Sequence, residues 1–254
     1  ITANQMMPFK STNMKYKIVL TLFAIASVTV LVSCKGCGRR GNGHVVTQNR
    51  TVQPFTGIEL DGAFSVEVSQ DGGDESVKVE TDDNLQQLIT VKNDGNTLVL
   101  AMTKKSAINW STKMKVYVNV KSVDHLTSSM VGKLSSSETL KADSLYLNIK
   151  SVGATNLQLD TKFLHADLSA VGNTTLAGTT QEARINNASV GALHAYDLKA
   201  QTMMIHNTAL GLTEIYADSA FYIRSDAVGK LNYKGPGAVK EMNASGVGNV
   251  SHVE

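Results

Sequence analysis

One short motif recurs through the second half of this 254-residue chain and limits its fold more than any other feature. It consists of a small residue, an aliphatic residue and a glycine, and its glycines follow one another at steps of 21, 19, 19, 20, 18 and 19 residues. A nearly constant period is typical of a solenoid, in which each repeat forms one coil stacked on the last. The glycines are Gly132, Gly153, Gly172, Gly191, Gly211, Gly229 and Gly248.

The residues around each glycine alternate between apolar and polar, which indicates β-strands. Helical repeats need more than about 30 residues per unit, so they do not fit this period. We therefore expect an all-β fold, a parallel β-helix of about 19 residues per coil with two or three short strands in each coil. The glycine suits a corner where φ is positive or where close stacking excludes a Cβ atom.

Two apolar columns are predicted to fill the core. One is the aliphatic residue directly before each glycine. The other stands six residues before it, and its members are Leu147, Ala166, Ile185, Ile205, Ile223 and Met242.

The head domain is predicted over residues 51–254, with regular coils over 124–254 and an irregular first coil and β-rich cap over 51–123. Within the cap, Asp82–Leu88 suits a short helix, and Asp94-Gly95 suits a hairpin turn. We expect Trp110 to be a buried residue of this cap.

The N-terminus has the pattern of an export signal. Lys15 and Lys17 precede a 15-residue apolar run, Ile18–Val32, which ends in Leu31-Val32-Ser33-Cys34. This ending resembles a bacterial lipobox, so residues 1–33 are interpreted as an upstream extension followed by a lipoprotein signal peptide, with Cys34 as the lipid-attachment residue. We expect an exported protein, lipid-anchored to the bacterial cell envelope. The outer membrane is favoured, and the periplasmic or surface-facing side is left open.

Residues 34–50 are rich in glycine and contain four basic residues and no acid, so they are predicted to be a flexible tether. Their charge could rest on anionic headgroups or simply be solvated. Without the first 33 residues, which hold three lysines, the chain has 21 basic and 22 acidic side chains. This balance gives no support to nucleic-acid binding.

Three segments together resemble a known family: Phe55–Gly62, the strand and Asp-Asn-Leu sequence at 77–85, and the repeated Val-Gly corners. They are similar to the GIN head domain of putative auto-transporter adhesins, largely bacterial envelope proteins of unknown function. The resemblance covers about residues 50–250. It implies a right-handed β-helix and an adhesin-like role, and it offers no catalytic residues to carry over.

Equivalent positions of successive coils stack, so outward side chains form columns. Seven residues before each glycine stand His125, Tyr146, His165, Arg184, Met204, Tyr222 and Glu241. Five residues before it stand Thr127, Asn148, Asp167, Asn186, His206, Arg224 and Asn243. Aromatic rings stack on sugar rings, and amide, carboxylate and guanidinium groups bind hydroxyls. The predicted binding residues for a glycan or protein ligand are Tyr146, His165, Asp167, Arg184, Tyr222 and Arg224. The same residue types also serve stacking alone, so a purely structural face stays open.

Other chemistry has less support. A carbohydrate-active enzyme needs clustered carboxylates. We expect no second outward acid near Asp167, with Glu214 and Asp226 on other faces. The six histidines lack the paired spacing of a metal site. We therefore predict no catalytic residues, no metal and no cofactor.

The sequence thus favours a non-catalytic envelope lipoprotein with an adhesin-like binding head. One alternative is a structural module that assembles end to end, with a homodimer formed through the open C-terminal coil. The other is a β-helix enzyme that acts on carbohydrate.

Overall fold

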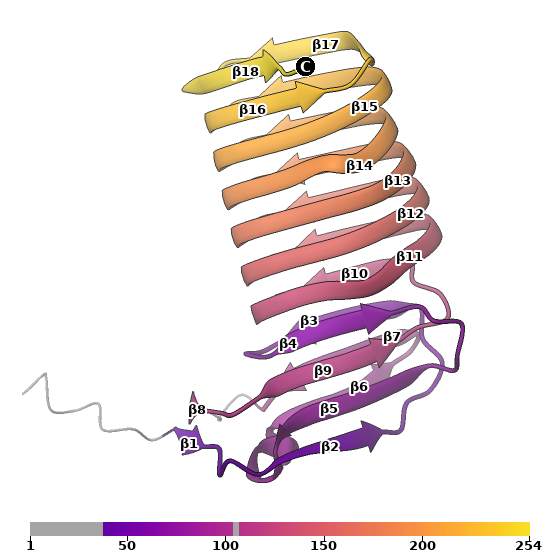
Figure 1. Ribbon diagram of the computed structural model, residues 1–254, viewed down its shortest axis with the longest axis vertical. Coiled ribbons are helices and arrows are strands. Elements are labelled where there is room, and N and C mark those ends of the chain that lie inside the picture. The colour runs from indigo at the N-terminus through magenta and orange to yellow at the C-terminus, as the bar shows by residue number, and fades with distance from the viewer. Residues whose placement is uncertain (1–37, 104–106) are drawn as a thin grey trace, which may run out of the picture.

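The computed structural model describes residues 38–103 and 107–254, which wind into a parallel β-solenoid (Figure 1). It has about seven turns of about 19 residues, which confirms the fold class predicted from the glycine spacing. The predicted signal peptide and Cys34 lie outside the described residues.

The described residues form eighteen strands and one 3₁₀ helix. In chain order they are β1 Arg39–Arg40, β2 Val45–Arg50, β3 Gly57–Asp61, β4 Ser65–Ser69, β5 Ser76–Asp82, η1 Asp83–Leu88, β6 Ile89–Asp94, β7 Thr97–Met102, β8 Ile108–Trp110, β9 Met114–Asn119, β10 His125–Ser128, β11 Val131–Ile149, β12 Val152–Leu168, β13 Val171–Asn187, β14 Val190–Asn207, β15 Leu210–Ser225, β16 Val228–Lys234, β17 Ala238–Ala244 and β18 Gly248–His252.

Each regular coil is one long bent strand, and this differs from the two or three short strands expected. Strands β11 to β15 are 16 to 19 residues long and pair in parallel. The pairing continues around the polar corner, where Lys141 pairs with Asp160 and Ala142 with Thr161. Because the backbone of the next coil follows the same bend, the hydrogen-bonded pairing between the two coils continues through the corner.

The glycines pair with one another from coil to coil, so the structure stacks glycine on glycine. Gly172 has a φ of +129°. A Cβ atom added to it would collide with the carbonyl oxygen of Gly153 on the coil before. Both reasons given for glycine at this corner therefore apply.

The predicted column six residues before each glycine does line the core. Leu147, Ala166 and Ile205 are almost fully buried, and their equivalents on the neighbouring coils are too. Met242 is the exception, with 40% of its surface exposed. It lies on β17, whose residues are all exposed, so the stack of side chains that buries the other members is incomplete there.

The aliphatic column directly before each glycine was predicted to point inward, and this prediction was wrong. Its first six members are between 48% and 57% exposed, and Val247 is 79% exposed. In the first six repeats the residue two before the glycine, such as Ala170 or Ser189, takes the inward place instead. The exposed column is Val131, Val152, Val171, Val190, Leu210, Val228 and Val247.

The cap extends both sheets of the solenoid at its N-terminal end. Strands β4 and β9 continue one sheet in parallel, and β5 and β2 then add to it antiparallel. Strands β3 and β7 continue the other, and β6 closes it as a hairpin. The helix η1 and this hairpin confirm the predicted local elements. Trp110 differs from its prediction, because it is 47% exposed on β8.

The flexible tether predicted over residues 34–50 is not what the structure shows from residue 38 onward. Strand β2 pairs along its whole length with β5. The buried Asp82 carboxylate holds the segment before β2 in place, because it accepts a hydrogen bond from the Gly43 amide at 2.7 Å. It also accepts one from the Thr112 amide at 2.8 Å. Burial raises the pKa of Asp82, but the hydrogen bonds from Thr112 and Gly43 outweigh it and hold the pKa below its usual value.

Candidate functional site

The two predicted outward columns lie side by side on one flat sheet, which we call the ladder face. The coil-to-coil pairing places Tyr146 beside His165 and His165 beside Arg184. Likewise Asp167 pairs with Asn186, and Tyr222 pairs with Met204. Both columns are outward, so the alternation of the sequence placed them correctly.

Asp167 is the centre of a hydrogen-bond network on this face. It accepts from the Tyr146 hydroxyl at 2.6 Å and from the Asn186 side-chain amide at 2.7 Å. His165 Nε2 lies 3.3 Å from the same carboxylate. Three coils thus converge on one acid, and Tyr146, Asp167 and His165 are held in fixed positions.

This network shifts two pKa values in opposite directions. Burial raises the pKa of Asp167, but its three partners outweigh burial, so that pKa lies below its ordinary value. The pKa of Tyr146 is raised, chiefly because its hydroxyl donates to the Asp167 carboxylate. At neutral pH the face therefore holds an ionised Asp167 and a neutral tyrosine hydroxyl.

The prediction that no second acid shares this face was wrong. Arg184 Nε lies 2.9 Å from Glu182 Oε1, on the coil next to Asp167. Asp226, which was assigned to another face, also belongs here, since its carboxylate lies 3.4 Å from Arg224 Nε and 3.6 Å from His206 Nε2.

The pKa of Asp226 is lowered, chiefly by its hydrogen bond with Ser245. Like Asp167, Asp226 is therefore ionised and already paired.

Two hollows lie on the ladder face and meet at His165 and Arg184. One has a volume of about 380 Å³, and its walls include Tyr146, Phe163 and Glu182. The other has a volume of about 420 Å³ and is lined by residues of the later coils, among them Met204, His206, Tyr222 and Arg224. Five of the six predicted binding residues line one or both hollows. Asp167 does not line them, and instead positions Tyr146 and His165.

Phe163 is the residue that sequence reasoning missed. It is 52% exposed, although it is a large aromatic side chain, and it lies two positions before His165 on the same strand and face. Tyr146 and His165 pack beside it with ring centroids 5.2 Å apart. The alternation of β12 would have placed Phe163 outward, so the signal was present in the sequence.

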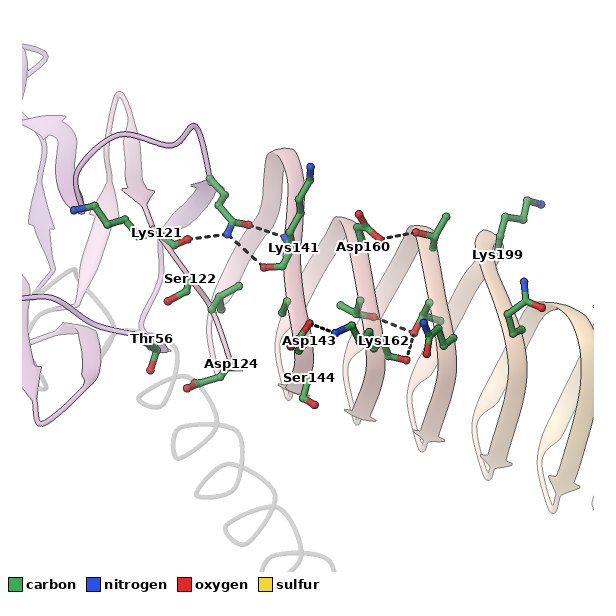
Figure 2. A pocket seen from close by; sticks show the side chains of 18 of the residues that line it. Thr56, Lys121, Ser122, Asp124, Lys141, Asp143, Ser144, Asp160, Lys162 and Lys199 are labelled. Atoms are coloured by element: carbon green, nitrogen blue, oxygen red, sulfur yellow. Dashed lines mark hydrogen bonds and ion pairs between the residues drawn. The ribbon is translucent and has the colours of Figure 1, made fainter.

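A polar groove follows the corner of the same coils, where the chain turns, and adjoins the first hollow, because Asp124 and Ser144 line both (Figure 2). Its volume is about 1060 Å³. Its lining includes small side chains, Ala142 and the buried Thr161 and Thr180, together with longer polar side chains. The side chains labelled in Figure 2 include Lys141, Asp160 and Lys199 on one rim and Asp143 and Lys162 on the other.

Much of the polar capacity of this groove is used internally. Lys162 Nζ pairs with Asp143 at 2.8 Å, and the Thr179 hydroxyl donates to Asp160 at 2.8 Å. Lys199 donates to the carbonyl oxygen of Tyr196 at 2.7 Å. Among the described residues that line the groove, none is aromatic. It therefore offers hydrogen bonds but no stacking platform, unlike the ladder face.

Over residues 38–103 and 107–254, no group of three His, Cys, Asp or Glu side chains converges to hold a metal ion. Within the same ranges, the structure has no helix long and apolar enough to cross a membrane.

The comparisons with known proteins agree with this architecture. The family model described as "Putative auto-transporter adhesin, head GIN domain" matches residues 54–237. A crystal structure of a putative adhesin from Bacteroides fragilis NCTC 9343 superposes with a TM-score of 0.80 at 24% identity, over 85% of this chain and 100% of that one. No curated protein matches the sequence.

Two further crystal structures share the fold. A putative adhesin from Parabacteroides merdae ATCC 43184 has a TM-score of 0.61 and 21% identity, over 85% of this chain and 99% of that one. A protein from Parabacteroides distasonis ATCC 8503, described as a putative lipid binding protein, has a TM-score of 0.62 and 18% identity, with the same coverage. At these identities the likeness shows the fold alone.

Proposed function

Because this chain belongs to the head GIN domain family of putative auto-transporter adhesins, we propose that it is a non-catalytic binding module of the cell envelope. Its ligand is a glycan, which it takes up on the ladder face. One observation carries the proposal: exposed aromatic rings and paired polar groups line two adjoining hollows on a rigid sheet.

The chemistry of the first hollow suits a sugar. Phe163 and Tyr146 present apolar ring surface, on which the C–H face of a pyranose can stack. Arg184 and Glu182 supply a donor and an acceptor at its rim for hydroxyl groups. Tyr146 and His165 are held by Asp167, so little side-chain entropy is lost when a ligand binds.

The second hollow extends the same surface toward the C-terminus. Tyr222, Arg224 and His206 repeat the combination of ring, guanidinium and imidazole. Successive coils are spaced by about 4.8 Å, so the two hollows together can accommodate several sugar units of an extended chain.

A catalytic role is disfavoured by the state of the carboxylates. Glycoside hydrolysis needs one carboxylic acid that keeps its proton near neutral pH. Asp167 and Asp226 both have lowered pKa values and accept hydrogen bonds from neighbours, so neither is suited to donate a proton. Release of sugar from a polysaccharide in an Asp167-dependent way would revive the enzyme alternative.

The proposed place of the head is the bacterial envelope, with Cys34 as the lipid-attachment residue and residues 1–33 removed as a signal peptide. The sequence supports this through its charged, apolar and lipobox segments in order. Acyl chains contribute about 0.8 kcal/mol for each buried CH₂ group, so several chains would hold the protein stably on a membrane. The outer membrane is our preferred location.

End-to-end assembly is the second candidate, favoured by one observation. Strand β17 is exposed throughout, and Val239 and Met242 on it are each 40% exposed. A second copy could cover them and form a homodimer through the C-terminal coil. Light scattering at increasing concentration tests this, and Met242→Lys should then weaken the dimer.

The test of glycan binding is a screen of residues 38–254 against a glycan array and cell-wall polysaccharides. The chain should begin at Gly38, because Gly43 donates to Asp82. Any ligand found should be lost in Tyr146→Ala/Arg184→Ala/Tyr222→Ala. The melting temperature of this variant should fall only slightly, because all three side chains are exposed and the lost hydrogen bond between Tyr146 and Asp167 lies at the surface. No ligand, together with a concentration-dependent dimer, would favour the assembly role.

A further inference from the structure

A small two-stranded sheet, separate from the solenoid, lies at the capped end of the molecule (Figure 1). Strand β1 pairs in parallel with β8. The Arg39 amide donates to the Ala107 carbonyl oxygen at 2.7 Å, and the Gly41 amide donates to the Trp110 carbonyl oxygen at 2.8 Å. These bonds fix residues 39–41 against β8.

The exposed side chains of this small sheet include one aromatic ring and two cations, and we call these three residues, Arg39, Arg40 and Trp110, the base patch. The guanidinium of Arg40 lies 5.3 Å from the centre of the Trp110 ring. Trp110 is about half exposed, and both arginines are exposed. Among the residues that the structure describes, neither arginine has an acidic partner within ion-pair distance.

The base patch is close to the proposed anchor along the chain. Five residue steps separate Cys34 from Arg39, and a fully extended chain covers at most roughly 18 Å in that distance. A lipid on Cys34 would therefore keep Arg39 within that distance of the anchored residue, which is close enough for Arg39, Arg40 and Trp110 to reach the headgroups.

The chemistry of the base patch fits that location. Tryptophan concentrates at membrane–water interfaces, where its ring meets the apolar region and its N–H stays hydrated. Arginine binds phosphate in a planar, two-point geometry. Basic groups next to an anchor are attracted to anionic lipid within a Debye length.

We propose that the base patch docks on the phospholipid headgroups of the membrane that holds the anchor, and that it orients the head. This inference rests on the lipid anchor at Cys34 proposed above. The capped end then faces the bilayer, and the regular coils rise roughly 30 Å away from it, which leaves the ladder face open to a ligand.

Trp110 makes the proposal measurable, because it is the only tryptophan of the chain. The full lipoprotein, purified from membranes, is reconstituted into vesicles of phosphatidylcholine and phosphatidylglycerol. Its Trp110 emission should shift to shorter wavelength, and a nitroxide near the headgroup should quench it more strongly than one deep in the acyl chains. Aqueous iodide should quench the Trp110 emission of the vesicle-bound lipoprotein less than that of the same protein without its lipid anchor, free in detergent-free solution.

Matched variants separate docking from anchoring. Arg39→Gln/Arg40→Gln should shift the docking equilibrium toward the undocked state by roughly 30-fold, since each basic residue near the surface contributes about a fivefold effect. Arg39→Lys/Arg40→Lys keeps the charge and should restore most of the lipid quenching. Lys230→Gln, an exposed change in the far part of the solenoid on β16, should change nothing.

Two readouts keep the anchor and the docking distinguishable. Mass spectrometry of the N-terminal peptide shows whether Cys34 carries lipid, and its absence would refute the anchor. Quenching of Trp110 decides docking separately. An acylated protein whose Trp110 stays accessible to iodide and insensitive to the lipid-bound nitroxide would overturn the base patch as a membrane contact.

Discussion

At the corners of the coils, single glycines meet two demands that no other residue meets together. Gly172 needs a left-handed φ of +129°, and it lies so close to Gly153 that a Cβ would collide with backbone. The spacing of the sequence identified these residues, since only a repeated structural demand keeps glycine at so regular a period.

The two demands can be separated by a pair of substitutions. Gly72→Ala introduces left-handed strain alone, because Gly72 has a φ of +82° and open space where the Cβ would lie. It should lower the free energy of unfolding by about 1 kcal/mol. Gly172→Ala adds the collision and should cost on the order of 3 kcal/mol or more. Equal losses in chemical denaturation would contradict the stacking account.

Another residue-scale prediction concerns the Asp167 network. Asp167→Asn removes the charge that holds the Tyr146 proton, so the pKa of Tyr146 should fall toward its ordinary value. The ring carbon signals of Tyr146 in a ¹³C-NMR titration measure this directly. Tyr222, which stands four coils further along the same column, serves as the control. An unchanged Tyr146 titration would mean that the hydrogen bond is absent in solution.

The sign of the pH effect on stability follows from the two shifts. The lowered pKa of Asp167 stabilises the fold at neutral pH, and this contribution is lost as pH falls through the acidic range around that pKa. The raised pKa of Tyr146 stabilises the fold below the ordinary tyrosine pKa of about 10, and that contribution is lost as pH rises above it.

At the scale of the strand, the place of a residue in the alternation of inward and outward side chains decides whether it is buried, and its hydrophobicity alone does not. The column six residues before each glycine is buried, so the residue directly before the glycine, five positions further on, must face outward. The sequence interpretation placed Val190 and its equivalents inside because they are aliphatic, and the structure exposes them. Alternation was the better guide, both here and for Phe163.

One strand carries both kinds of column and allows a direct test. On β14, Ile205 is 3% exposed and Val190 is 49% exposed. Ile205→Ala should cost about 2–5 kcal/mol of unfolding free energy, as expected for a core truncation. Val190→Ala should stay within about 1 kcal/mol. Urea denaturation of both variants would contradict this assignment if their losses were alike.

Elements set by distant contacts were beyond a local interpretation of the sequence. The glycine-rich, basic segment before residue 50 has the composition of a linker, yet β2 joins the cap because β5 offers it a full edge. The partner of Gly43 is Asp82, 39 residues away. Likewise, His206, the second basic side chain near Asp226 on the ladder face, stands on the coil before it and is distant in the chain.

At the scale of the whole molecule, the solenoid separates three surfaces with different chemistry. The ladder face carries rings and paired polar groups, the corner groove carries balanced charges without rings, and the base patch lies at the capped end. The period of the sequence predicted the stack and the ladder columns. The hollows and the groove depend on how far neighbouring side chains extend from the sheet, and the repeat period does not specify this.

The central claim is that the ladder face, and not the corner groove, binds the ligand. The most direct measurement is the Kd of one glycan from the screen, determined for three proteins. They are the unchanged head, the ladder variant Tyr146→Ala/Phe163→Ala/Arg184→Ala, and a groove variant with the same number of alanine substitutions.

The groove variant is Lys141→Ala/Asp160→Ala/Lys199→Ala, and all three of these side chains are exposed. We predict that the ladder variant weakens binding by at least about 30-fold, as loss of a central aromatic or arginine contact does, while the groove variant stays near the original Kd. Retained affinity in the ladder variant, with loss in the groove variant, would contradict the claim and assign the ligand to the groove.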